Sequence, residues 1–158
     1  MSPSKSPIVS NELLTLISLA KNAGEAILGY HGNCKSTVKS DGTPSTIADE
    51  TAGRIISAGL RERRYLVVNE EEAECVSTQI PEAGIAWVDP IDGTEEFVKG
   101  TEKFWMLIGI ARQNIPVLGV AYNPVTKEVF FAENNGCYQE KKTASVQSIY
   151  LPNLGSIE

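Results

Sequence analysis

Two aspartates, Asp89 and Asp92, are the residues whose chemistry stands out first. They follow an apolar segment, 85–88, and lie three positions apart. Carboxylates at the end of a rigid strand are hard oxygen ligands of the kind that Mg²⁺ takes. Pro90 between them fixes φ and has no N–H, which stiffens the turn and helps to aim the Ile91 carbonyl. This spacing indicates a cation site.

The two residues after these aspartates are of types that could help to bind an anion. Gly93 lets the backbone approach a ligand without a Cβ in the way, and Thr94 begins a predicted short helix. Free N–H groups at the start of such a helix would face an anion. The alternative is an ordinary strand–turn–helix corner in which Asp92 or Thr94 caps the helix. Six specified residues in a row, 89–94, directly after a strand favour a site for cations and a phosphate.

A second group of carboxylates follows the preceding apolar segment, 65–68, and includes Glu70 and Glu71. Taken alone, this acidic run is typical of a solvated turn. The sixteen residues 69–84, however, are long enough for the crossover that a parallel strand pair needs. In a parallel pair, Glu70 and Asp89 would emerge at the same sheet edge, where open sheets place their ligands.

A fourth carboxylate, Asp49, lies in the first turn of a predicted helix that begins near Ser45 or Thr46 and runs to about Arg63. On the sequence alone, Asp49 is favoured as a capping-box residue that reaches back to Thr46. A ligand-facing role remains open, because a carboxylate has several acceptor sites.

These carboxylates together would place three or four like charges within a few ångströms of one another. Their repulsion would raise some of their pKa values unless cations neutralised them. An all-oxygen ligand set without His or Cys favours Mg²⁺, or Mn²⁺, over Zn²⁺. The chemistry that this implies is attack of an ion-activated water on a phosphate ester. The residues concerned are Asp49, Glu70, Asp89 and Asp92.

The remaining elements form a scaffold for this site. Apolar residues at helical spacing predict a first helix from about Asn11 to Tyr30, with Ser10 or Asn11 as its cap. After Gly100 the pattern predicts an antiparallel meander, with strands at 105–111, 116–122, 128–132 and 137–139 and an edge strand at 146–150. The predicted fold is α+β in one domain, 1–158: two N-terminal helices on a mostly antiparallel sheet, with residues 1–9 disordered.

Composition excludes several classes of function. The chain has 158 residues, 42% of them hydrophobic, and a net charge of −6, which disfavours binding of polymeric nucleic acid. It contains no apolar run long enough for a membrane helix. Three widely spaced cysteines fit neither zinc spacing nor a disulfide framework, so free thiols and a cytoplasmic location are expected.

The stretch Asp89-Pro90-Ile91-Asp92-Gly93-Thr94 resembles the signature of the Mg²⁺-dependent, lithium-sensitive phosphatases. This superfamily includes inositol monophosphatases, fructose-1,6-bisphosphatases and 3′(2′),5′-bisphosphate nucleotidases. The continuation through Glu95, Glu96 and Phe97 resembles the nucleotidase branch. Residues 39–49 are similar to a second family stretch, Lys-x-Asp-x-(Ser/Thr)-Pro-(Val/Ser)-Thr-x-Ala-Asp. The resemblance extends from about Leu13 to Gly136.

The resemblance implies roles for individual residues. Glu70, Asp89 and the Ile91 carbonyl would hold a first ion, and Asp92 would belong to a second; two or three ions are expected in the full fold.

The same resemblance implies the groups that act on substrate. Glu70 and Thr94, the latter oriented by a hydrogen bond to Asp49, would polarise the attacking water. Backbone N–H groups of Gly93 and Thr94 would hold phosphate oxygens, and Glu71 would lie close by.

The resemblance also implies an activity and a missing part. The expected reaction is removal of the 3′-phosphate of adenosine 3′,5′-bisphosphate, with inositol monophosphatase activity as the alternative. The chain resembles only the first half of the sugar-phosphatase αβαβα fold, and the Trp-Asp-x-Ala-Ala motif of the second half is absent. A homodimer, or pairing with a chain that supplies the missing half, is therefore expected. A non-catalytic half-domain that binds metal or a partner is the hypothesis from another class.

Overall fold

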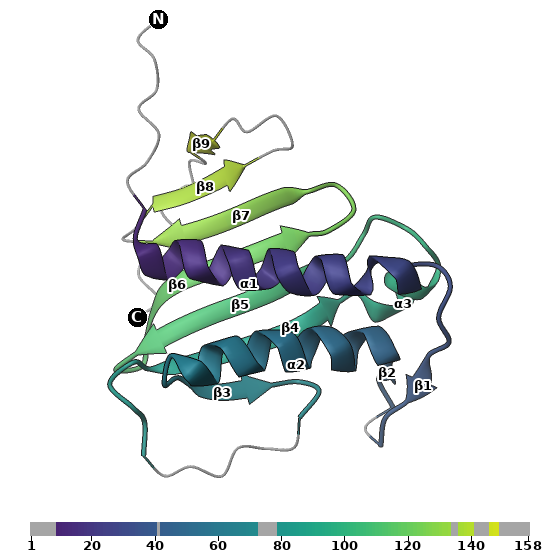
Figure 1. Cartoon of the computed structure of the whole chain (residues 1–158), viewed down its shortest axis with the longest axis horizontal. Coiled ribbons are helices and arrows are strands. Elements are labelled where there is room, and N and C mark those ends of the chain that lie inside the picture. The colour runs from purple at the N-terminus through teal and green to yellow at the C-terminus, as the bar shows by residue number, and fades with distance from the viewer. Residues whose placement is uncertain (1–8, 41, 73–78, 134–135, 141–145, 149–158) are drawn as a thin grey trace, which may run out of the picture.

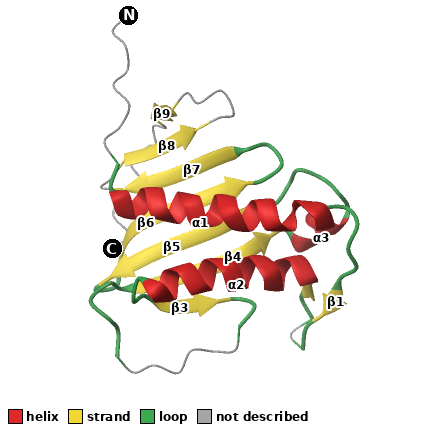
Figure 2. Cartoon of the chain, viewed as in Figure 1, coloured by secondary structure: helices red, strands yellow, loops and turns green. Residues whose placement is uncertain are grey.

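The computed structural model describes residues 9–40, 42–72, 79–133, 136–140 and the backbone of 146–148. Two long helices, α1 (Asn11–Ile27) and α2 (Ile47–Glu62), lie side by side on one face of a large sheet (Figure 1). Figure 2 shows the same two layers, with the helices in red over the yellow strands. The predicted α+β fold is confirmed.

Seven strands form the sheet, in an order that follows the chain. They are β3 (Leu66–Asn69), β4 (Ile85–Asp92), β5 (Trp105–Arg112), β6 (Ile115–Asn123), β7 (Glu128–Glu133), β8 (Gly136–Glu140) and β9 (Val146–Ser148). β3 and β4 are parallel, which the length of segment 69–84 allowed, and each later neighbouring pair is antiparallel. The antiparallel meander predicted after Gly100 is confirmed. The carboxyl ends of β3 and β4 therefore lie at one edge of the sheet, beside the short helix α3 (Thr94–Val98) (Figure 1).

Both long helices begin at predicted caps. The Ser10 hydroxyl accepts a hydrogen bond from the Leu13 N–H at 3.1 Å and starts α1. Thr46 caps α2 in a complete capping box with Asp49. α1 passes into a 3₁₀ turn, η1 (Leu28–Tyr30), and the chain then turns at Gly32, where φ is +70°. Each helix start is thus encoded locally by a side-chain acceptor for the first free N–H groups.

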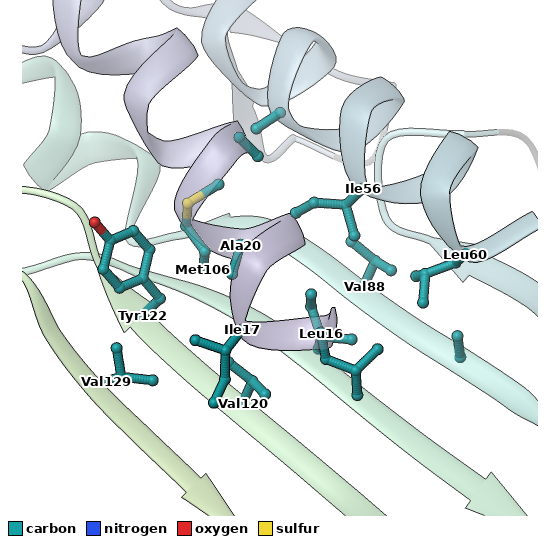
Figure 3. Close-up of a cluster of buried hydrophobic side chains, with 14 of the residues drawn as sticks. Leu16, Ile17, Ala20, Ile56, Leu60, Val88, Met106, Val120, Tyr122 and Val129 are labelled. Carbon is teal, nitrogen blue, oxygen red and sulfur yellow. The ribbon is translucent and has the colours of Figure 1, made fainter. Parts of the chain in front are cut away.

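The core lies between the two helices and the inner face of the sheet. Figure 3 shows side chains of α1 and α2 meeting alternate residues of four strands; those labelled are Leu16, Ile17, Ala20, Ile56, Leu60, Val88, Met106, Val120, Tyr122 and Val129. Period-2 alternation in the strands and a one-sided stripe in each helix explain this burial. Gly24 permits the close approach of α1 to β6, because a Cβ there would lie 2.8 Å from Tyr122 and Pro124.

The described long helices both lie on one face of the sheet and leave the opposite face, here called the outer face, uncovered (Figure 2). Apolar side chains of the outer face are partly exposed. Val68 and Trp87 are 38% and 46% exposed. Trp105 and Phe130 make an edge-to-face contact, with centroids 5.4 Å apart. Strands that are apolar on both faces are typical of sheets that are packed on both sides.

The structure differs from the sequence prediction at two segments. β1 (Thr37–Val38) and β2 (Pro44–Ser45), for which no strand was predicted, form a small hairpin. β4 does not end before the aspartates but runs through them to Asp92, with a shift of register between Asp89 and Asp92.

Two further expectations concern the chain ends and membranes. Val9 packs against the core, and residues 1–8, the rest of the segment predicted to be disordered, lie outside the described residues. Among the helices that the structure describes, none combines the length and the apolarity needed to cross a membrane.

Candidate active site

Glu70 and Asp89 meet at the carboxyl ends of the parallel strands. The Glu70 N–H donates to the Val88 carbonyl at 3.1 Å, which continues the β3–β4 pairing by one residue. Burial, followed by the negative charges of Glu70 and Asp92, raises the pKa of Asp89 to about 7. The three carboxylates are therefore close enough to repel one another, and a cation beside them would relieve that repulsion.

The backbone between the aspartates turns sharply. The Ile91 N–H donates to Asp89 Oδ1 at 3.1 Å, which holds the Asp89 side chain against its own turn. Gly93 then adopts a φ of +99°, and a Cβ there would lie 2.9 Å from the Lys103 carbonyl oxygen. Both observations require glycine at the start of α3.

Asp49 joins α2 to the signature turn. Its Oδ2 accepts from the Thr46 N–H at 2.8 Å and from the Thr46 hydroxyl at 2.5 Å. Its Oδ1 lies 3.0 Å from the Thr94 hydroxyl, which is also 3.1 Å from the Ile91 carbonyl oxygen. The hydrogen bond to Thr94 implied by the family resemblance is present, together with the capping box. One buried carboxylate makes both interactions, one on each oxygen.

The environment of Asp49 disfavours its charge. The residue is 1% exposed, and burial raises its pKa, while hydrogen bonds from Thr46 and Thr94 act in the opposite direction. Its side chain is thus held in one position by three donors, and it holds the Thr94 hydroxyl in turn.

We expect Asp49→Asn to destabilise the fold by about 2 kcal/mol. Both carboxylate oxygens of Asp49 accept hydrogen bonds, and in asparagine an NH₂ group, which cannot accept, replaces one of them. Chemical denaturation measures this loss. Glu50→Gln, an exposed change in the same helical turn, is the control and should stay within about 0.5 kcal/mol of the parent. Equal stability of Asp49→Asn and the control would contradict the assigned hydrogen bonds.

Lys39 is a member of the site that the sequence reasoning missed. Its ammonium lies 2.5 Å from Glu71 Oε1 and 3.8 Å from Glu70 Oε1. Burial lowers the pKa of Lys39, but the hydrogen bond to Glu71 and the charges of Glu71, Glu70 and Asp49 raise it overall. Ser45 donates to the other Glu71 oxygen at 2.8 Å. Both carboxylate oxygens of Glu71 are therefore bound by side chains of the β1–β2 hairpin segment. Glu70, in contrast, lies close enough to Asp89 to affect its pKa.

The chemistry of these side chains suits a divalent ion. Glu70, Asp89, Asp92 and the Ile91 carbonyl offer only oxygen, the donor type that hard cations prefer. Among the described residues, no three His, Cys, Asp or Glu side chains already stand in an arrangement that could hold an ion. A bound cation must therefore draw the carboxylates together against their mutual repulsion.

A shallow pocket of about 360 Å³ opens beside the carboxylates on the outer face. Its wall is mostly apolar and combines the two acids with residues of β3, β4 and β5: Val68, Glu70, Trp87, Val88, Asp89, Leu107 and Gly109. The candidate site thus borders the uncovered apolar face of the sheet.

Comparisons with known proteins identify relatives of this chain. A model of the inositol monophosphatase family matches residues 10–154. The 3′(2′),5′-bisphosphate nucleotidase CysQ of Salmonella typhimurium is 35% identical over 78% of this chain and 52% of its own length. An inositol monophosphatase of Mesembryanthemum crystallinum is 30% identical over 77% of this chain and 47% of its own. The chain spans about half the length of the curated relatives it matches.

Solved structures show the same fold. CysQ from Bacteroides thetaiotaomicron, a bacterial member of the family, aligns with a TM-score of 0.68 and 36% identity, covering 82% of this chain and 49% of that one. The extragenic suppressor protein suhB from Bartonella henselae aligns with a TM-score of 0.74 and 29% identity, covering 82% and 52%. With its sequence matched almost from end to end and its fold shared, this chain belongs to the inositol monophosphatase family.

Proposed function

We propose that this chain carries the metal-binding part of a Mg²⁺-dependent phosphatase of the 3′(2′),5′-bisphosphate nucleotidase type. The reaction is release of the 3′-phosphate of adenosine 3′,5′-bisphosphate. The observation that carries the proposal is the meeting of Glu70 and Asp89 at one sheet edge, with Thr94 held 3.0 Å from Asp49. The family is metal-dependent, and CysQ relatives at 33–35% identity are bisphosphate nucleotidases.

Each group has a distinct task in this proposal. Glu70, Asp89 and the Ile91 carbonyl would hold a first cation, and Asp92 would belong to a second. A bound cation would neutralise these charges and make water more acidic. Asp49 fixes the Thr94 hydroxyl at the entrance to α3. Together with Glu70, that hydroxyl orients the attacking water for in-line displacement at phosphorus. N–H groups of Gly93 and Thr94 hold phosphate oxygens.

The proposed substrate is tested by comparing phosphate release from adenosine 3′,5′-bisphosphate and from inositol 1-phosphate at one Mg²⁺ concentration. The nucleotide should be hydrolysed faster, and Asp89→Asn is the blank. Faster release from inositol 1-phosphate would instead assign the alternative activity, which the relative from Mesembryanthemum favours. No Mg²⁺-dependent release from either substrate would leave a half-domain that binds metal or a partner.

Glu95 and Glu96, which favoured the nucleotidase branch in the sequence, make contacts within their own segment. The Lys99 ammonium lies 3.7 Å from Glu95 and 2.8 Å from Glu96, and the Thr101 hydroxyl donates to Glu96 at 2.8 Å. These contacts stabilise α3 and the following turn. Support for nucleotide over inositol phosphate therefore comes from the relatives and not from these two side chains.

We further infer that the outer face pairs with polypeptide, either a second copy of the chain or a chain equivalent to the remaining half of the relatives. The exposed Trp87 beside the apolar pocket supports this inference. The cytoplasmic location also stays a proposal, which the free thiols of Cys34 and Cys137 support.

Light scattering after size-exclusion chromatography tests pairing between copies. The purified chain should elute as a dimer, and Trp87→Gln should shift it toward monomer by removing the largest exposed apolar side chain of this face. Ile47→Gln, at a 51% exposed position on α2, is the matched control and should leave the dimer intact. A monomeric parent chain would exclude the homodimer and leave pairing with a different chain.

A further inference from the structure

A cationic pocket lies at the end of the sheet opposite the carboxylates. It has a volume of about 510 Å³ and is lined by Arg63, Arg64, Pro81, Glu82, Ala83 and Arg112. These residues lie where α2 ends, where β4 begins and where β5 ends, at the tail of the β4 arrow in Figure 1. From Ile85, at the start of β4, to Asp89 the strand advances about 13 Å, and the pocket lies before that start, so the two sites are separate.

The pocket concentrates one side-chain type in an acidic chain. The chain has a net charge of −6 and five arginines, and three of the five line this pocket. Its lining holds one carboxylate, Glu82, which is exposed. Three arginines from two separate elements line one cavity. Guanidinium groups are the side chains best suited to bind phosphate groups.

Arg112 is the fixed member of this cluster. Its Nε donates to the Ala83 carbonyl at 3.1 Å, and a terminal nitrogen donates to Glu12. Tyr65 also donates to Glu12, so the acid is shared and offsets one of the three charges. The guanidinium is therefore held at the pocket before any ligand arrives.

Arg64 provides an independent observation. Its φ is +66°, the left-handed conformation that helix C-termini usually give to glycine. Its N–H donates to the Arg61 carbonyl at 2.9 Å and closes the last turn of α2. An arginine is strained at this position, so the surrounding structure must hold it there.

A favourable interaction of basic side chains with the end of a helix explains only part of this grouping of arginines. Basic side chains near a C-terminus stabilise the helix dipole, and Arg63 does so by donating to the Gly59 carbonyl at 2.8 Å. This effect accounts neither for the left-handed Arg64, where glycine would serve the helix better, nor for Arg112, which comes from the end of β5.

We propose that this pocket binds a small molecule with at least two adjacent anionic groups, such as a diphosphate. The volume suits a small phosphorylated ligand. The site is distinct from the carboxylate site, needs no metal, and does not depend on the phosphatase proposal.

Binding is measured by calorimetry with inorganic pyrophosphate in excess EDTA, on the full chain. The parent should bind saturably, and the affinity should fall as salt rises. Arg64→Gly should weaken binding about tenfold through the lost charged hydrogen bonds, while relief of the backbone should raise Tm by about 2–4 °C. A variant that is more stable yet binds less separates ligand binding from folding.

Lys127→Gly is the matched control. Lys127 has a φ of +63° at the β6–β7 turn, so the change removes one cation and relieves the same conformation away from the pocket. Lys127→Gly should raise Tm by a similar amount and leave the affinity for pyrophosphate unchanged. Asp89→Asn should also bind pyrophosphate with the affinity of the parent. Arg63→Ala should weaken binding. Absence of saturable binding by the parent, unchanged binding by Arg64→Gly, or loss of binding in Asp89→Asn would overturn the proposal.

Discussion

Asp89→Asn should make the metal-free chain more stable at pH 8 and remove its stabilisation by Mg²⁺. Asp89 has a pKa of about 7 in the fold, above the ordinary value of 3.8, because it is buried next to Glu70 and Asp92. A raised carboxyl pKa means that the folded state binds more protons than the unfolded state between these two values. The stability of the metal-free chain therefore falls as pH rises from about 4 to about 7.

The neutral amide removes that penalty and keeps the acceptor for the Ile91 N–H. In EDTA, the variant should unfold at a higher temperature than the parent at pH 8, and the difference between the two proteins should be clearly smaller at pH 5. With Mg²⁺ at 100 times its Kd, the parent should gain about 2.7 kcal/mol, which corresponds to roughly 5–10 °C in Tm, and the variant should gain almost nothing.

Thermal denaturation of both proteins in EDTA and in Mg²⁺, at the two pH values, measures the difference in Tm between the proteins and the change in Tm that Mg²⁺ causes in each. Glu95→Gln removes an exposed carboxylate near the signature and is the matched control, expected to respond to Mg²⁺ like the parent. A Mg²⁺ response in Asp89→Asn equal to that of the parent would remove Asp89 from the metal site.

The second large effect is expected for Thr94→Ala, which should lower the rate of phosphate release about 100-fold or more while leaving the Mg²⁺ response of Tm intact. The methyl group cannot replace the hydroxyl that lies between Asp49 and the Ile91 carbonyl. A positioned group that takes part in proton transfer contributes typically 10²–10⁴-fold.

Thr94→Ser keeps the hydroxyl and should recover most of the rate, which separates the loss of a reacting group from a loss of packing. Steady-state rates at saturating Mg²⁺ are compared for the three proteins. Equal rates for the parent and Thr94→Ala would discard the proposed role of this hydroxyl. A lost Mg²⁺ response would place Thr94 in metal binding instead.

Much of the fold could be predicted from the sequence because it depends on residues that are close together in the chain. Ser10 and Thr46 start helices through acceptors within three residues, and strand alternation fixes which side chains face the core. The length of the connection between two apolar segments allowed a parallel β3–β4 pair, and the structure contains that pair. The hydrogen bond between Asp49 and Thr94 spans 45 positions and was implied only by family resemblance.

Other features depend on contacts that no local pattern encodes. Lys39 and Glu71 are 32 positions apart and meet only because the β1–β2 hairpin folds beside the end of β3. The hairpin itself has two residues in each strand, too few to produce a visible alternation. β4 runs through Pro90 because the irregular register between Asp89 and Asp92 accommodates a residue without an N–H donor.

The most direct test of the metal site is a crystal structure of the chain soaked in Mn²⁺, with anomalous difference maps to locate the ion. We expect a peak at coordination distance from Glu70, Asp89 and the Ile91 carbonyl, with the carboxylates drawn together around it. No peak at the ends of β3 and β4, with Asp89 still turned onto the Ile91 N–H, would contradict the assignment of these residues as the metal site.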